Sequence, residues 1–495
     1  MRNIFVFLLA VITVHLQGQG INDVLRISQY DYNSTARFSG VSGAFGALGA
    51  DIGVATINPA GIAEFRKSEF TLGFGAPLSS NTASLAGTST DNSENGFQLT
   101  NLAVVMTSRP RNFNRKTFNV AVTFQQLSSF REEIIYAGAT PGTRVERWLE
   151  LAQGSRVDEL GNFEEGPAFD AEAILVNDDE VSYRSDFDTN LDAQLNRGET
   201  ISRSGTLNEL GVTIAANERN KFSWGVGLGI PILTFSETKE YTETDGGDVV
   251  EFFDALRWTE TLDVTGGGVN IKAGVIYKLT PTFRFGASIQ SPTFYVISDD
   301  YSTSLDYEFT FDGQSSRGTG SSPNFDEPFE YSITTPWRAN AGIGYIYKVG
   351  EFLGFISGDV EYVDYTAGSI DLALNSDNPT DQLNSDFINA QLDNEATSVL
   401  NYRLGTELAY GAVRFRLGAS LTTGPFADES RFEPGVNLSG GLGYRADRWY
   451  VDASYSLRPS DQRYSPYQLT DPQFEQRVDI SSSNAFANLT FGVKF

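Results

Sequence analysis

The chain has no cysteine and a single histidine, His15, among its 495 residues. Without cysteine it can form neither disulfides nor the thiolate sites that hold structural zinc and iron–sulfur clusters. Because His15 lies in a segment that we expect to be removed, the mature protein is expected to lack histidine too. Histidine-dependent catalysis and histidine-ligated metals are therefore excluded, and we predict no cofactor, no metal site and no enzymatic activity.

Basic residues are scarce as well. The chain has 36 Lys and Arg against 63 Asp and Glu, a formal net charge of −27 and a pI of about 4.4. A surface that follows nucleic-acid phosphates needs a basic face, so we predict no nucleic-acid partner. The acidic runs 178–180 and 299–300 lack the regular ligand spacing of a calcium motif and are interpreted as solvated acid.

Long apolar runs are also missing, and the mean hydropathy is −0.23. Residues 1–18 are predicted to be a signal peptide, with Arg2 as its positive start, an apolar core at Ile4–Val14 and the small residue Gly18 at its end. That core has eleven residues, whereas a membrane helix needs roughly 20. We therefore expect an exported protein.

The sequence is rich in alternating segments. Phe118–Phe124 and Phe283–Ile289 place apolar residues at one parity and polar or small residues at the other, as strands with two unlike faces do. The last segment, Leu489–Phe495, alternates up to a terminal Phe and resembles the assembly signal of bacterial outer-membrane barrels. We therefore expect the barrel assembly machinery to be a partner through Phe495, and outer-membrane lipid to surround the protein.

The turns allow the strands to be counted. Short polar connections between alternating segments occur at 109–116, 217–220, 280–282, 348–351, 410–412 and 446–448. These six hairpins give twelve strands, and further strands at about 68–77 and 484–495 bring the number to fourteen. An even number of antiparallel strands can close without an edge, so the prediction is an all-β, fourteen-stranded transmembrane barrel over 68–495.

Long acidic or Ser/Asn/Gly-rich connections alternate with the short turns. They are predicted at 78–96, 129–204, 242–255, 300–330, 372–397, 423–435 and 459–483. Short turns on one side and long loops on the other are typical of outer-membrane barrels. The largest, 129–204, has 17 acidic and seven basic residues and is interpreted as a solvated external loop with a short helix at Arg144–Ala152.

Residues 19–67 do not alternate and are too apolar for a free tail in water. Phe38–Gly49 is rich in small residues, and Ala50–Ala63 continues this character. The barrel lumen is the only large enclosure that such a chain could offer the segment. We therefore predict an internal plug, or hatch, at 19–67, in which glycine and alanine allow close backbone packing.

These residues resemble a known family. Ser39–Asp51 followed by Asn58-Pro59-Ala60-Gly61 is similar to the plug of the outer-membrane long-chain fatty acid transporters, the FadL family, which includes the toluene channels of the TodX type. Phe285–Pro292 and Thr335–Arg338 resemble two of its strand segments. The family fold is a fourteen-stranded barrel.

The resemblance implies passive uptake of hydrophobic compounds across the bacterial outer membrane, with long-chain fatty acids as the expected ligands. Ligand would land on an external groove, enter a lumenal pocket beside the plug and leave sideways through the barrel wall when the plug shifts. The alternative is a barrel that serves as a scaffold or binding partner of an outer-membrane secretion machine. Many Phe, Leu and Ile residues are available to line an apolar pocket.

Two sets of site residues are predicted. Asn58, Pro59, Ala60 and Gly61 are assigned to gating, because proline disfavours helix at the residue before it and Gly61 can adopt backbone conformations closed to other residues. Arg338 and Arg403 are the lumenal candidates for a ligand carboxylate; the alternative is that they pair within the barrel. Parity also places further polar residues in the lumen: Lys272, Arg284, Asn340, Glu407, Arg414, Arg416 and Asp452.

Overall fold

The computed structural model describes residues 20–110, 115–324, 327–376, 378–428 and 435–495. The predicted signal peptide, 1–18, and the middle of the predicted turn 109–116 lie outside the described residues. Within the described chain the dominant element is the β-strand.

The strands are β1 (Glu69–Leu85), β2 (Thr88–Asn95), β3 (Gln98–Ser108), β4 (Arg115–Ser129), β5 (Glu132–Thr140), β6 (Leu175–Val176), β7 (Tyr183–Arg184), β8 (Leu195–Glu218), β9 (Phe222–Thr244), β10 (Phe253–Lys278), β11 (Phe283–Gln290), β12 (Phe294–Phe311), β13 (Gln314–Ser321), β14 (Phe329–Thr334), β15 (Arg338–Val349), β16 (Phe352–Asp364), β17 (Ser369–Asp371), β18 (Ser398–Tyr410), β19 (Val413–Thr422), β20 (Gly435–Arg445), β21 (Trp449–Tyr464) and β22 (Val478–Lys494).

The helices are shorter and fewer. The α-helices are α1 (Ile21–Ser28), α2 (Ala36–Ser39), α3 (Val145–Ala152), α4 (Glu165–Asp170) and α5 (Pro379–Glu395), and the 3₁₀ helices are η1 (Ile52–Thr56), η2 (Pro59–Glu64), η3 (Val157–Glu159), η4 (Tyr365–Ala367) and η6 (Pro472–Phe474). Among the described residues, no helix combines the length and the apolar character needed to cross a membrane.

The main sheet closes on itself. Neighbouring strands pair antiparallel around the ring, and β22 pairs with β1 along the whole of β1. Four barrel strands consist of two pieces each: β2 with β3, β4 with β5, β11 with β12, and β14 with β15. β17 continues β16 by pairing with β14, and β13, among the strands that the structure describes, pairs only with β12, outside the ring. Counted in this way, the barrel has the fourteen strands predicted from the turns.

Two of the strand breaks contain proline. β11 and β12 are separated at Ser291–Thr293, around Pro292, and β14 and β15 are separated at Thr335–Trp337, around Pro336. Proline has no N–H to donate to a β-ladder, so the pairing changes there. Between the breaks and the short turns, β11 pairs with β15. On the other side of the breaks, toward the long connections, β12 pairs with β14.

The outer face of the barrel is apolar. On β18, Leu400, Tyr402 and Leu404 face outward and are 43%, 45% and 60% exposed, whereas Asn401 and Arg403 between them are buried. The same alternation recurs on the other barrel strands. A closed barrel satisfies its backbone hydrogen bonds internally and presents this apolar surface to lipid, so the fold is a transmembrane β-barrel.

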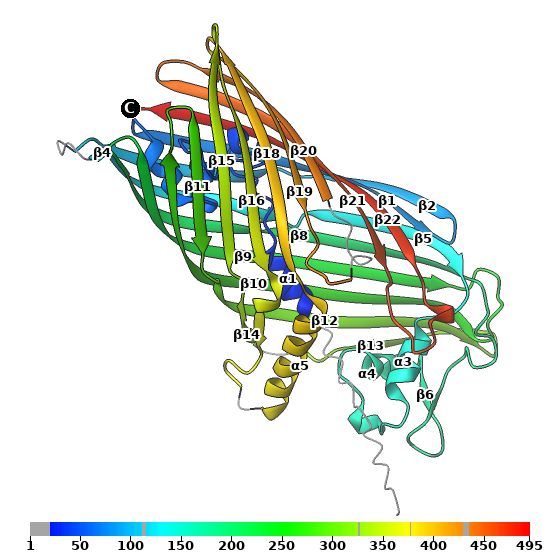
Figure 1. Ribbon diagram of the computed structural model, residues 1–495. Coiled ribbons are helices and arrows are strands. Elements are labelled where there is room, and N and C mark those ends of the chain that lie inside the picture. Colours follow the sequence, from blue (N-terminus) through cyan, green and yellow to red (C-terminus); the bar gives the residue numbers. More distant parts are fainter. Residues whose placement is uncertain (1–19, 111–114, 325–326, 377, 429–434) are drawn as a thin grey trace, which may run out of the picture.

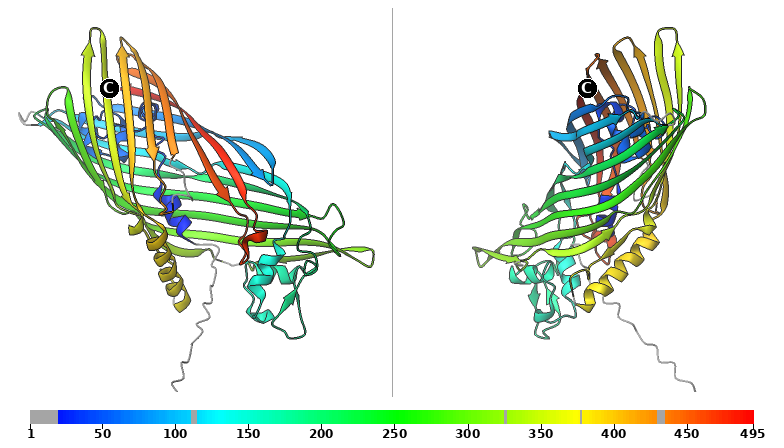
Figure 2. Two further views of the ribbon diagram at one scale, coloured as in Figure 1. Left: turned by 45° about the vertical axis from the view of Figure 1, so that its right-hand side comes forward. Right: turned by 90° about the vertical axis from the view of Figure 1, so that its left-hand side faces the viewer.

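The tight turns lie at one end of the barrel and the long connections at the other (Figures 1 and 2). The long connections are more regular than predicted. β1 continues through Leu85 and pairs with β2, and β12 pairs with β13 across much of 300–330. The expectation of loops there was wrong. β2 and β13 are polar on both faces but still pair their backbones, and β12 alternates, with Leu305 and Tyr307 buried and Ser304 and Glu308 exposed.

The largest connection is folded. The predicted helix at 144–152 is present as α3, and residues 141–194, here called the external unit, also contain α4 and the β6–β7 hairpin. Trp148 and Phe187 are buried there, and Trp148 packs on Trp258 of β10 at 5.2 Å between ring centroids. The interpretation of the segment as a solvated loop was therefore wrong, although many of its acidic side chains are exposed.

Residues 20–67, here called the amino-terminal segment, lie inside the barrel (Figure 1). Its backbone rests directly on glycines of the wall: a Cβ atom added at Gly225 would collide with the Pro59 carbonyl, one at Gly286 with the Gly46 carbonyl, and one at Gly418 with the Val41 backbone. The glycine-rich strand segments thus make room for the amino-terminal segment. The exact division of the chain at 18 and 67 stays a prediction.

Side chains of the wall also satisfy the backbone of this segment. Asn119 donates to the Ile62 carbonyl at 2.6 Å, and Ser288 donates to the Ile57 carbonyl at 2.6 Å. From the other direction, the Gly46 N–H donates to the Asp359 carboxylate at 2.7 Å. A segment with little regular structure of its own therefore has its polar backbone groups paired within the lumen.

Candidate functional site

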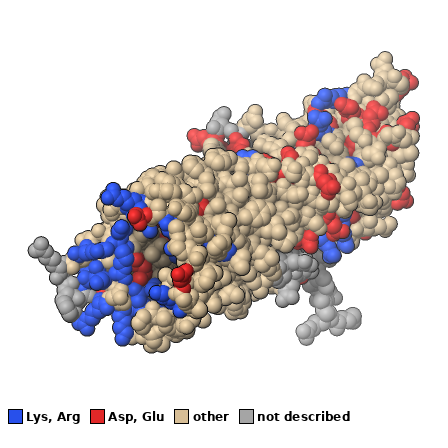
Figure 3. Space-filling view, turned by 90° about the horizontal axis from the view of Figure 1, so that it is seen from above, with Lys and Arg blue, Asp and Glu red and all other residues tan. Residues whose placement is uncertain are grey.

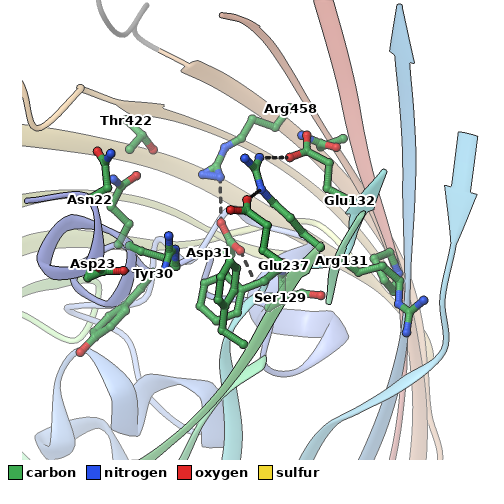
Figure 4. Close-up of a pocket in the computed structure, with 18 of the residues that line it drawn as sticks. Asn22, Asp23, Tyr30, Asp31, Ser129, Arg131, Glu132, Glu237, Thr422 and Arg458 are labelled. Atoms are coloured by element: carbon green, nitrogen blue, oxygen red, sulfur yellow. Dashed lines mark hydrogen bonds and ion pairs between the residues drawn. The ribbon is translucent and has the colours of Figure 1, made fainter. Parts of the chain in front are cut away.

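A cavity of about 990 Å³ lies in the lumen between the amino-terminal segment and the end of the barrel that carries the long connections. Asn22, Tyr30 and Asp31 of the amino-terminal segment form one side of it, and Arg131 and Arg458 come from the barrel (Figure 4). We call it the lumenal cavity.

The lining of the lumenal cavity is rich in charge of both signs. Its seven acidic residues are Asp23, Asp31, Glu132, Glu237, Glu260, Glu361 and Glu395, and its seven basic residues are Arg26, Arg131, Arg203, Lys239, Arg338, Arg403 and Arg458. Apolar side chains such as Phe130, Phe235 and Leu262 interrupt this lining. The expectation of a predominantly apolar pocket is therefore wrong for this cavity.

Ion pairs cross the strands on one wall of the cavity. Arg203 of β8 pairs with Glu132 of β5 at 2.9 Å and with Glu237 of β9 at 2.5 Å. Lys239, two residues further along β9, lies 3.5 Å from Glu237 and 3.6 Å from Glu260 of β10. Two cations thus alternate with three carboxylates along this wall and fill it with polar groups.

The external unit contacts this ion-paired wall at Glu260. The Arg144 guanidinium, at the start of α3, pairs with Glu260 at 2.7 Å and lies 4.9 Å from the centroid of the Trp258 ring. Arg144 is almost completely buried. Burial opposes charge on this guanidinium, but the neighbouring carboxylates of Glu260, Glu164 and Glu199 together outweigh it and raise the pKa of Arg144.

Arg338 and Arg403 both line the cavity, but each already has partners in the protein. Glu361 of β16 lies 2.6 Å from Arg403 and 3.4 Å from Arg338, and it also accepts a hydrogen bond from the Tyr32 hydroxyl. The guanidinium of Arg338 stacks 4.0 Å above the Tyr30 ring. The geometry thus favours pairing within the barrel, and a role in ligand binding stays a prediction.

The amino-terminal segment contacts the wall of the cavity through Asp31. Its carboxylate pairs with Arg458 of β21 at 2.8 Å, and the Ser129 N–H of β4 donates to it at 3.5 Å (Figure 4). Asp31 therefore links the segment to two strands that are distant in sequence.

Helix α1 fills the apolar part of the lumen. Ile21, Val24 and Leu25 are buried against a cluster that includes Leu207 of β8 and Leu233 of β9. The polar face of α1 turns toward the cavity. Here burial raises the pKa of the Asp23 carboxyl, although Arg26 at 2.8 Å acts in the opposite direction.

The predicted gating residues Asn58, Pro59, Ala60 and Gly61 are all buried on the far side of the segment from the cavity. Asn58 caps η2: its side-chain oxygen accepts from the Ala60 N–H at 3.1 Å. The amide nitrogen of Asn58 donates to the Gly46 carbonyl at 2.7 Å and to the Val275 carbonyl of β10 at 3.3 Å. Asn58 thereby ties two parts of the segment to the wall.

Gly61 was predicted to adopt a backbone conformation closed to other residues, and this prediction was wrong. The backbone φ of Gly61 is not positive, so glycine is not required there for a left-handed conformation. Glycine is required for space, because a Cβ atom at Gly61 would lie 2.5 Å from a Val54 methyl and 3.1 Å from the Gly49 Cα. The Gly61 carbonyl also accepts from the Ala50 N–H at 3.1 Å.

The polar residues that parity predicted to face the lumen are buried or half-buried. Lys272, Asn340, Glu407, Arg416 and Asp452 are buried, and Arg284 and Arg414 are half-buried. Most form ion pairs inside the barrel; Arg416, for example, lies 2.7 Å from Glu407 and 2.8 Å from Asp452.

Several residues that line the cavity were not predicted from the sequence. Glu361 lies between outward-facing Val360 and Tyr362, so the same parity argument could have placed it in the lumen. Arg203 and Glu132 fell within a segment interpreted as a loop, where parity was not applied. Within the part of the chain that the structure describes, no cluster of three or more acidic side chains is arranged to hold a metal ion.

The fold is similar to that of solved transport proteins. A FadL homologue from Pseudomonas aeruginosa shares 11% sequence identity over 93% of this chain and 98% of that chain, with a TM-score of 0.53. The toluene transporter TodX from Pseudomonas putida shares 11% identity over 95% of this chain and 99% of that chain, with a TM-score of 0.50. No protein-family model matches the sequence, and no curated protein matches it significantly. The chain therefore has the FadL-type barrel fold suggested by residues 39–51 and 58–61.

Proposed function

We propose that the protein is a channel of the bacterial outer membrane for passive uptake of hydrophobic compounds, with long-chain fatty acids as the expected ligands. The observation that carries the proposal is a FadL-type barrel whose lumen holds its own amino-terminal segment below a cavity of about 990 Å³. That TodX is a toluene transporter supports the class of ligand. The protein is proposed to be a channel and not an enzyme.

In the proposed route, ligand enters the lumenal cavity from the side of the long connections. Its apolar part packs against Phe130, Phe235 and Leu262, and its polar part meets the ion-paired wall. Burial contributes roughly 0.8 kcal/mol per CH₂, enough for micromolar binding of a long chain. Asn58–Gly61 then shift with the amino-terminal segment, and ligand leaves sideways through the wall.

Arg338 and Arg403 are the proposed partners of a ligand carboxylate. A carboxylate would have to compete with Glu361, which already pairs with both guanidiniums. A charge-assisted hydrogen bond contributes about 1.5–3 kcal/mol at most. We therefore expect the apolar chain of the ligand to dominate its affinity.

Titration of the purified protein with fatty acids of increasing length tests the ligand class. The dissociation constant should fall with each added CH₂ until the cavity is filled, and haem and sugars should bind far more weakly. Equal affinity for all chain lengths, or tighter binding of haem, would reject hydrophobic uptake.

Replacement of Asn58 with Ala and of Gly61 with Val tests the gate. Both variants should reduce uptake of a hydrophobic probe while the barrel still shows heat-modifiable gel mobility. Gly440→Ala is the matched control, because the nearest atom to an added Cβ there is 3.7 Å away. Unchanged uptake in both gating variants would make 58–61 a simple link between the amino-terminal segment and β1.

The alternative is a scaffold or binding partner of an outer-membrane secretion machine. The exposed apolar side chains Leu383 (66% exposed) and Phe387 (54% exposed) on α5 favour it, because α5 lies in a long connection. An unoccupied cavity in every ligand titration, together with loss of a protein complex in L383S/F387S, would favour the scaffold. Deletion of Phe495 should slow barrel assembly in either case, since the proposed contact with the assembly machinery is independent of cargo.

A further inference from the structure

Basic side chains gather at the short-turn end of the barrel. Lys67, Arg109, Lys116, Lys221, Lys348 and Arg448 are all exposed there, and they come from five different connections around the circumference. We call these six residues the basic rim. None of them forms an ion pair with a carboxylate among the described residues.

The rim contrasts with the charge of the rest of the chain. The whole protein carries a formal charge of −27, yet Lys and Arg dominate the surface at this end, around a hollow (Figure 3). At the opposite end Asp and Glu are more frequent and mix with Lys and Arg (Figure 3). On this face, exposed Lys and Arg side chains are thus densest at the short-turn end.

Exposed aromatic side chains lie directly beside the rim on the lipid-facing surface. Phe222, Tyr277, Tyr345, Tyr410 and Trp449 are all exposed near the short turns. The Lys221 ammonium lies 5.5 Å from the centroid of the Tyr277 ring. Aromatic girdles sit at the membrane–water interface, so the rim is level with the lipid head groups.

We propose that the basic rim binds the anionic head groups of phospholipids in the leaflet that meets the short turns. Each exposed cation near an anionic leaflet is attracted to it, and salt screens this attraction. The ring of separate turns suits many small mobile anions around the circumference better than one compact acidic protein. The inference rests on the membrane placement proposed above but not on which ligand is transported.

Tryptophan quenching tests the rim in the full-length protein reconstituted into vesicles. Trp449 lies next to Arg448 and is 43% exposed, whereas Trp337 is 51% exposed and lies at the other end of β15 from its short turn. The double variant W224F/W337F leaves Trp449 as the lipid-exposed reporter. The double variant W224F/W449F leaves Trp337 in that role and serves as the reference position.

Vesicles would contain equal fractions of brominated phosphatidylglycerol or brominated phosphatidylcholine. We expect the anionic lipid to quench Trp449 at least about twofold more than the zwitterionic lipid, since several cations act together and each is attracted. Trp337 should show no such preference. R448Q and K67Q should lower the preference at Trp449, and high salt should abolish it.

Arg477→Gln is the matched control, because Arg477 is an exposed cation just before β22 at the opposite end and, like the rim residues, has no ion pair among the described residues. It should leave the preference at Trp449 unchanged. Mass spectrometry of lipid retained by the protein after extraction from mixed vesicles gives a second measurement that needs no tryptophan variant. Equal quenching by the two lipids together with equal retention would overturn the proposal, as would binding of an acidic polypeptide to the rim without lipid preference. Fatty acid uptake can fail without changing either readout.

Discussion

The amino-terminal segment and the external unit both pack against the barrel, but different interactions hold them. The segment lies with its backbone against wall glycines such as Gly225 and Gly286, and polar wall side chains pair with its carbonyls. The external unit is held by a buried aromatic cluster that includes Trp148, Phe187 and Trp258.

The kind of interaction affects how easily each region can move. Hydrogen bonds from wall side chains to backbone carbonyls contribute only about 0.5–1.5 kcal/mol each, because water can replace them. A buried aromatic side chain contributes several kcal/mol that water cannot replace. Helix α1 and the aromatic side chains Phe38 and Phe45 of the amino-terminal segment are also buried in apolar clusters. We therefore expect movement of the segment to begin at the hydrogen-bonded turn 58–61, and the external unit to stay in place.

The largest effect is expected for Trp148→Ala. Trp148 is fully buried against Trp258, and removing a buried Trp side chain costs about 3–5 kcal/mol. Protease should then cut within 141–194 at lower urea concentrations than in the wild type. The barrel should keep its heat-modifiable gel mobility; loss of the barrel as well would show that the external unit and barrel fold as one cooperative unit.

A smaller effect is expected for Gly225→Ala. The added methyl group collides with the Pro59 carbonyl, and overpacking of this kind costs about 1–3 kcal/mol. The wall holds the backbone next to Pro59 through hydrogen bonds such as those at Ile57 and Asn58. We therefore expect this turn to shift and the barrel to stay closed by its own ladder. A labelling reagent should then reach a cysteine introduced at Ala60 faster than in the parent A60C protein. Gly440→Ala is the control, and an equal labelling rate in the two glycine variants would contradict the comparison.

The smallest effect concerns pH and the external unit. Burial raises the pKa of the Asp186 carboxyl, which accepts from the Tyr307 hydroxyl at 2.8 Å. A carboxyl whose folded pKa is raised stabilises the folded unit fully below its unfolded pKa of about 3.9, and this stabilisation is lost as the pH rises through the folded pKa. The protease resistance of D186N relative to wild type should therefore increase as the pH rises from 4 to 8. A constant ratio of cleavage rates over that range would show that Asp186 does not titrate differently in the folded unit.

Much of the barrel could be predicted because its signals are local. Turn residues and the alternation of two faces are readable within about ten residues, and together they predicted fourteen strands and the inward position of Arg338 and Arg403. Parity gave no signal where both faces of a strand are polar, as along β2 and β13. Those strands were interpreted as loops because hydrogen bonds between backbones leave no mark on composition.

The sequence by itself determined the barrel, its strand number, its short-turn end and the small-residue character of the amino-terminal segment, because each follows from residue period or residue size. Only the tertiary structure decided which groups meet: Glu361 pairs with both Arg338 and Arg403, Gly61 is needed for space beside Val54, and Arg144 reaches Glu260. These contacts join positions tens to hundreds of residues apart, or depend on how a turn is packed. They arise when the sheet closes around the amino-terminal segment, and no local pattern encodes them.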